Sequence, residues 1–174
     1  MGTINYSTSD YITLGIKPYD YSDFTNDAEF MEEMLQKVEE YGGTLEDEIY
    51  SYIDELYLCD YRNIGHELKN HDFSYFHVAI KPGYYEGFTL DIEFNYGLCF
   101  NSWEDRRDAQ KEITEIKKFL KTCAGLGMVA CFTGWRTTYS DYNSTLKEID
   151  RAIKEMRETV RETPTWNQYS AECA

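Results

Sequence analysis

The segment from residue 73 to residue 96 carries the pattern that most restricts how this chain can fold. In its second half, apolar and polar side chains alternate: Phe88, Leu90, Ile92 and Phe94 with Thr89, Asp91, Glu93 and Asn95. Residues 76–80 alternate in the same way, and a period of two is typical of half-buried β-strands. Between the two runs, 81–87 contains Pro82 and two glycines, which end strands and permit a turn. The sequence therefore predicts a two-stranded antiparallel ribbon with one apolar face and one polar face.

Helical periodicity surrounds this ribbon. Apolar residues that recur every three or four positions predict five helical segments: 27–41, 45–58, 61–68, 103–123 and 141–162. Asn26 and Thr44 are the expected N-caps of the first two, and Pro164 ends the last. The residues between Tyr19 and Thr25 are expected to form a loop.

Two further segments, 11–16 and 128–133, are short and apolar and are expected to be strands. The resulting order predicts an α+β fold. Its expected architecture is a ferredoxin-like βαββαβ antiparallel sheet with helices on one face, an acidic helical insertion and an extra C-terminal helix. Residues 1–164 are expected to form a single domain, which includes the acidic helical segment 27–58. Residues 165–174 are expected to form a loose C-terminal tail.

Several classes of protein are disfavoured by composition. No apolar run approaches the ~18 residues that a membrane span needs, so no membrane association is expected. The first residues lack the basic start and apolar core of a secretory signal. The five cysteines include no Cys-x-x-Cys pair, which is typical of a reduced, cytosolic protein. We therefore expect a cytoplasmic protein.

The net charge of −15 is distributed very unevenly. Residues 1–60 contain 15 acidic and two basic residues, a net charge of −13, whereas residues 61–174 contain 17 acidic and 15 basic residues, a net charge of −2. Such an asymmetry repels nucleic acid and anionic membranes and attracts a basic partner over long distances. The sequence thus disfavours direct nucleic-acid binding and favours a protein partner with a basic groove. Carboxylates on the polar face of the ribbon also disfavour single-stranded RNA as a ligand.

No set of residues predicts catalysis, a metal site or a cofactor. His66, His71 and Cys59 lie close together in the sequence but lack the spacing of zinc ligands. The cysteines and serines have no local motif of an activated nucleophile, and no glycine-rich phosphate loop is present. We therefore expect no catalytic residue, metal ligand or cofactor, and the sequence favours a protein that is not an enzyme.

Candidate partner-binding residues fall into two groups. The first comprises carboxylates on the exposed faces of the helices predicted within 27–58: Glu29, Glu32, Glu33, Glu39, Glu40, Glu46, Asp47, Asp54 and Glu55. Such an array can offer a basic groove something like a phosphate backbone, or it can be an ordinary solvated face. The second comprises aromatic and arginine side chains in two loops, a composition typical of interface centres: Tyr84, Tyr85, Trp135 and Arg136. These side chains can equally pack at the ends of the domain.

Several short segments, spread along most of the chain, carry a family resemblance. They are Ser9-Asp10-Tyr11-Ile12-Thr13-Leu14-Gly15, Pro82-Gly83-Tyr84-Tyr85-Glu86-Gly87-Phe88, Ile92-Glu93-Phe94-Asn95-Tyr96, Thr133-Gly134-Trp135 and Pro164-Thr165-Trp166. The chain resembles small acidic proteins of phages and plasmids of Firmicutes, and within them the type II-A anti-CRISPR proteins, which are inhibitors of Cas9. The resemblance implies stoichiometric binding to Cas9 with its guide RNA, which blocks DNA binding or cleavage. Two alternatives remain: a nucleotide or small-molecule binding protein that uses the Trp135-Arg136 loop, and a nuclease acting on guide RNA.

Overall fold

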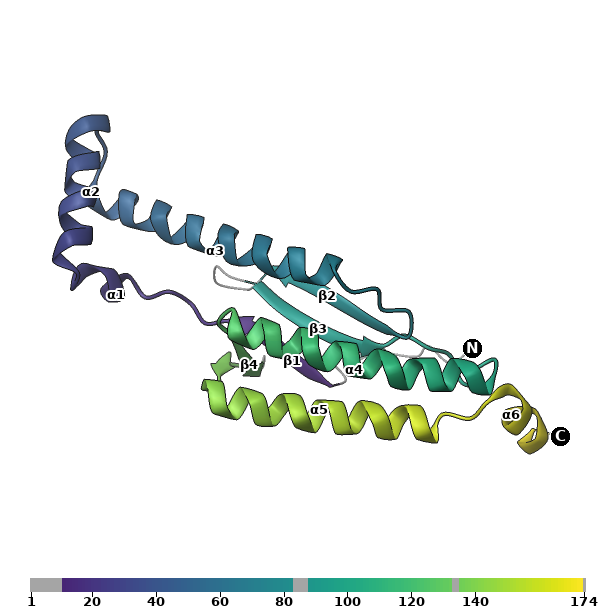
Figure 1. Ribbon diagram of the computed structural model, residues 1–174. Helices are drawn as coiled ribbons and strands as arrows, with labels where there is room; N and C mark the ends of the chain where they lie inside the picture. The colour runs from purple at the N-terminus through teal and green to yellow at the C-terminus, as the bar shows by residue number, and fades with distance from the viewer. Residues whose placement is uncertain (1–10, 83–87, 133–134, 174) are drawn as a thin grey trace.

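The computed structural model describes residues 11–82, 88–132 and 135–173 (Figure 1). Within them the chain is α+β, as predicted, with a five-stranded antiparallel sheet in the order β2-β3-β1-β4-β5. The strands are β1 (Ile12–Ile16), β2 (Phe76–Pro82), β3 (Phe88–Phe94), β4 (Met128–Phe132) and β5 (Thr138–Tyr139). The helices are α1 (Tyr21–Thr25), α2 (Ala28–Tyr41), α3 (Leu45–Lys69), α4 (Trp103–Gly125), α5 (Tyr142–Glu162) and α6 (Trp166–Glu172).

The predicted ribbon is confirmed as the β2–β3 hairpin. Its pairs run from Phe76↔Phe94 to Pro82↔Phe88. Phe88, Leu90 and Ile92 of β3 are buried and Phe94 is partly buried, because these side chains share one face of the sheet and pack against the core. The connecting residues 83–87, which include the candidate anchors Tyr84 and Tyr85, lie outside the described residues.

A single hydrophobic core lies between the sheet and helices α3, α4 and α5. Leu14 and Leu90 are paired neighbours on β1 and β3, and both are fully buried. Phe119 of α4 and Ile149 of α5 are likewise fully buried, and α4 and α5 run side by side over the sheet (Figure 1). The Tyr61 ring of α3 meets Phe88 edge-on, so α3 covers the same sheet face.

Three local predictions are corrected. The helix predicted to end near residue 58 and the separate piece at 61–68 form one helix, α3, because no glycine or proline lies between them at 59–60 and Tyr57 and Ile64 are buried on one stripe. The N-cap of α2 is Asp27 rather than Asn26, since the Asp27 carboxylate accepts hydrogen bonds from two backbone N–H groups of the first turn. The expected loop before it contains the short helix α1.

The C-terminal residues are not the loose tail that the sequence predicted. They form helix α6, and the segment before it is tied to Phe100, which is fully buried. The N–H of Phe100 donates to the carbonyl of Pro164 at 2.8 Å, and the N–H of Trp166 donates to the carbonyl of Phe100 at 2.7 Å. Arg106 adds a hydrogen bond from its guanidinium to the carbonyl of Thr163.

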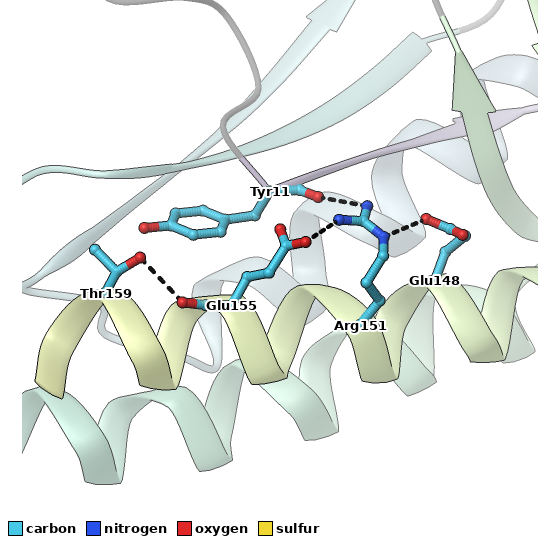
Figure 2. Close-up of polar contacts among 5 residues, drawn as sticks. All are labelled: Tyr11, Glu148, Arg151, Glu155 and Thr159. Atoms are coloured by element: carbon cyan, nitrogen blue, oxygen red, sulfur yellow. Dashed lines mark hydrogen bonds and ion pairs between the residues drawn. The ribbon is translucent and has the colours of Figure 1, made fainter. Parts of the chain in front are cut away.

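Arg151 attaches the start of β1 to helix α5 (Figure 2). Its guanidinium donates to Glu148 at 2.8 Å and to Glu155 at 2.7 Å on the same helix, and to the carbonyl of Tyr11 at 3.1 Å. The two carboxylates hold the guanidinium in place beside that carbonyl and raise the pKa of Arg151. The cluster is therefore structural: it fixes the N-terminal end of β1 against α5.

Glu112 of α4 holds the start of β2. Its carboxylate accepts hydrogen bonds from the backbone N–H groups of Ser74, Tyr75 and Phe76 at 2.9, 3.0 and 3.1 Å. A backbone N–H group that is buried without such an acceptor lowers the free energy of unfolding.

Replacing Glu112 by alanine should therefore lower the free energy of unfolding by about 2 kcal/mol, because three charge-assisted hydrogen bonds are lost and water replaces only part of them. Urea denaturation followed by circular dichroism measures this. Glu115→Ala is the matched control, since Glu115 lies on the same helix and its exposed carboxylate pairs with Lys118 and, at 3.9 Å, with His71. We expect that control to leave stability nearly unchanged. Equal losses in both variants would contradict the role given to Glu112.

Candidate functional site

The acidic part of the chain forms an arm, which we define as residues 20–60. It comprises helices α1 and α2 and residues 45–60 of α3. Helices α1 and α2 lie beyond the end of the sheet, beside the start of α3 (Figure 1). A small aromatic cluster holds them there. The Tyr52 ring of α3 lies 5.7 Å from Phe24 and 4.9 Å from Phe30, and Met34 and Ile49 are buried beneath. This packing gives the arm an apolar interior and leaves its polar side chains outside.

All nine carboxylates predicted on the arm are exposed: Glu29, Glu32, Glu33, Glu39, Glu40, Glu46, Asp47, Asp54 and Glu55. The arm has 14 acidic residues and a single basic one, Lys37. Among the described residues, Glu33 is the member of this set that has an ion pair, with Lys37 at 3.3 Å. The structure therefore brings these side chains together on one projecting part of the molecule, where their charges are largely uncompensated.

Helix electrostatics separates these carboxylates into two kinds. Glu29, Glu46 and Asp47 lie in the first turns of α2 and α3, where a negative charge stabilises the helix. Glu39 and Glu40 lie in the last turn of α2, which contains no basic residue. A negative charge there opposes the helix dipole and costs about 0.3–1 kcal/mol. Local stability thus explains the first group and does not explain the second.

Tyr19, which immediately precedes the arm, is fixed to the α3 part of the arm. Its backbone N–H donates to the Tyr57 hydroxyl at 2.7 Å, and its own hydroxyl donates to Asp60 at 2.7 Å. The two rings lie 4.9 Å apart. Burial, with the adjacent Asp60 carboxylate, raises the pKa of Tyr19 well above its usual range. The Tyr19 hydroxyl therefore stays neutral and continues to donate its hydrogen bond to Asp60. The connection between the sheet and the arm is held at two points, by Tyr57 and by Asp60.

Trp135 and Arg136 lie on the connection between β4 and β5, not on the acidic arm. Trp135 is fully exposed and Arg136 is exposed. The alternative that these side chains pack at the end of the domain is therefore incorrect for Trp135. Phe132, at the end of β4, is also largely exposed, so this connection presents two aromatic side chains to solvent.

A buried charge that the sequence did not predict lies on the sheet face opposite the helices. Asp91 was expected to point outward, but it is only 6% exposed. One carboxylate oxygen accepts a hydrogen bond from the Thr13 hydroxyl at 2.9 Å, and the other pairs with the Lys81 ammonium at 2.9 Å. The hydrogen bond to Asp91 raises the pKa of Lys81. Because both oxygens are occupied, Asp91 is placed to hold three strands together rather than to accept a proton from a substrate.

The sequence contains only a weak signal for this cluster. Thr13, Asp91 and Lys81 each occupy the polar phase of a strand, but their contact depends on which strands pair and in which register. Cys131 lies near the same face, where burial and the Asp91 carboxylate raise the pKa of its thiol to about 11. That thiol is therefore protonated at neutral pH and is not an activated nucleophile.

Among the described residues, no three His, Cys, Asp or Glu side chains are grouped so that they could hold a metal ion. No helix in 11–82, 88–132 or 135–173 combines the length and apolar character needed to cross a membrane.

The fold and the site define the class of protein: an α+β domain with a projecting, highly acidic helical arm. No family model, no curated protein and no solved structure matches the chain. The arm and its charges are therefore the features from which a function can be inferred.

Proposed function

We propose that this protein is a non-enzymatic inhibitor encoded by a mobile genetic element, which binds a nucleic-acid-handling enzyme in the cytoplasm of the host bacterium. Its acidic arm occupies a basic groove of that enzyme and stands in for nucleic acid. The observation that carries the proposal is the composition of the arm, with 14 acidic residues against one basic residue and nine exposed carboxylates on two helices.

Electrostatics gives this binding mode its free energy. A groove that holds nucleic acid is lined by lysine and arginine, and it releases condensed ions when a polyanion enters. Charges repeated along α2 and α3 can replace part of that polyanion and also speed the encounter. Glu39 and Glu40 support the proposal further, because they remain at the end of α2 despite the cost to the helix.

Cas9 is the first target to test. The resemblance to type II-A anti-CRISPR proteins indicates Cas9 as the target, and the chemistry of Cas9 fits the arm. Effectors of this type hold the guide and target strands in a positively charged channel and recognise the short flanking motif through arginines. An acidic arm in that channel would block DNA binding, cleavage or both.

We also assign the sheet to a ferredoxin-like arrangement with an acidic helical insertion. In support of this assignment, four strands follow the order β2-β3-β1-β4, α4 connects β3 to β4, and α1–α3 connect β1 to β2. Strand β5 and helices α5 and α6 are additions to that arrangement. The acidic arm is then a replacement for a simple crossover helix.

A pull-down of the tagged protein with guide-loaded Cas9, at low and high salt, tests the function beside a DNA-cleavage assay. We expect binding that blocks cleavage and that weakens as salt increases, because the contacts are ionic. The guide RNA should stay at full length, which distinguishes inhibition from the nuclease alternative. Absence of binding together with uninhibited cleavage would overturn the choice of Cas9, and salt-independent binding would overturn the acidic mimicry.

A further inference from the structure

A cavity of about 320 Å³ lies where the arm joins the sheet. The end of β1 and the following residues form one side, α1 and α3 contribute from the arm, and the turn between α4 and β4 lines the remaining side of a cavity that is open to solvent. The lining side chains that matter here are Ile16, Lys17, Tyr19, Asp23, Asp60 and Leu126. This volume is at the lower end of the range for ligand pockets, which suits one long side chain better than a large molecule.

The polar groups of the cavity are suited to a cation. Asp60 uses one carboxylate oxygen to accept the Tyr19 hydroxyl, and Asp23 uses one to accept the N–H of Asp20 at 3.2 Å. Among the described residues, the second oxygen of each carboxylate accepts no hydrogen bond. Two carboxylates and the single ammonium of Lys17 leave the lining with one uncompensated negative charge, at the base of an arm that is itself strongly negative.

The walls of the cavity are suited to an aliphatic stem. Ile16 is buried and Leu126 is partly exposed, and both line the cavity beside the carboxylates. Lysine and arginine place apolar methylene groups against such walls while the charged end meets polar groups. The planar guanidinium of arginine can also donate to more than one carboxylate, which a compact ammonium does less well.

We propose that this cavity receives one arginine side chain from the basic partner, as an anchor at the base of the acidic arm. The inference rests on the proposed function, since it assigns the anchoring residue of the same partner. The arm supplies long-range attraction, and the cavity supplies a position in which one guanidinium is bound in a defined way.

Titration of the full chain with N-acetyl-L-arginine methylamide, followed by two-dimensional NMR of the backbone amides, tests the cavity. We expect saturable shifts at Lys17, Tyr19 and Gly127, and no such shifts with the uncharged norleucine analogue. Asp60→Asn should weaken the arginine affinity about tenfold, because it removes a charge while keeping an oxygen that can accept the Tyr19 hydroxyl. Asp72→Asn is the control: it removes one exposed charge outside both the cavity and the arm, and we expect little change.

Three results would overturn the inference: no saturable shifts at the lining amides, equal shifts with the norleucine analogue, or equal weakening by Asp60→Asn and Asp72→Asn. The last would mean a diffuse attraction to negative charge alone. The titration contains no Cas9, so its failure leaves the binding and cleavage assays unaffected. Conversely, a chain that binds arginine in the cavity but does not inhibit Cas9 would contradict the choice of Cas9 as the target. It would not contradict the assignment of the cavity as an arginine site.

Discussion

Replacing Lys81 by methionine should lower the free energy of unfolding by about 2–3 kcal/mol. The substitution leaves Asp91 buried with only the Thr13 hydroxyl as a partner. Removal of one partner from a fully buried ion pair costs about 3–5 kcal/mol, and the smaller figure reflects the Lys81 side chain, which is 40% exposed and so lets water reach the pair. Chemical denaturation monitored by circular dichroism measures the loss.

Two variants show whether the loss comes from the unpaired charge. Lys117→Met removes an ammonium that is also 40% exposed but lies 3.6 Å from the well-exposed carboxylate of Asp150, and it should cost less than about 0.5 kcal/mol. Adding Asp91→Asn to Lys81→Met should recover much of the lost stability, because the neutral amide still accepts the Thr13 hydrogen bond and needs no counter-charge. Equal losses for Lys81→Met and Lys117→Met would contradict a special role for this pair.

The contribution of Lys81 should also depend on pH in a definite direction. The pKa of Lys81 is raised in the folded protein above its ordinary value of 10.5, chiefly by the hydrogen bond to Asp91. A group whose folded pKa is raised contributes stability that is complete below its unfolded pKa and is lost as the pH rises through the folded pKa. The difference in stability between the parent chain and Lys81→Met should thus stay constant through neutral and mildly alkaline pH and decrease above pH 10.5.

Reversing four charges on the arm should reduce the affinity for the partner by at least about 100-fold. The substitutions are Glu32, Glu33, Glu39 and Glu40 to lysine, which place like charges against the basic groove. They raise the net charge from −15 to −7, since each changes it by two. Loss of inhibition in the cleavage assay and loss of binding in the pull-down measure the effect. Unchanged inhibition by a folded variant would contradict the acidic mimicry.

The control for this variant applies the same change in net charge outside the arm. It replaces four exposed acidic residues by lysine: Asp72, Glu104, Glu162 and Glu172. Inhibition should persist in the control if the position of the charge matters and not its total. Folding of the arm variant is also predictable, because lysines at positions 39 and 40 favour the end of α2 and should leave its thermal stability intact. Similar loss of inhibition in both variants would indicate general electrostatic attraction.

The fold was predictable where neighbouring residues determine structure. Alternation in 76–80 and 88–95 was sufficient for the β2–β3 hairpin, and spacings of three and four were sufficient for α4 and α5. Exposure of the nine arm carboxylates was equally predictable, because charged residues on the outer side of an amphipathic helix are seldom buried. Boundaries were less certain, as the continuous α3 and the Asp27 cap show.

What the sequence by itself determined is therefore the local structure and the location of the charge: a hairpin, amphipathic helices and a strongly acidic first third. Only the tertiary structure decided which distant side chains meet. Burial of Asp91 between Thr13 and Lys81 requires a specific sheet order and register, and the cavity at the base of the arm requires Tyr19, Asp60 and Leu126 to converge from three separate segments of the chain. The physical reason is that periodicity acts over a few residues, whereas these contacts join segments separated by tens of residues and depend on the free energy of the whole packed chain.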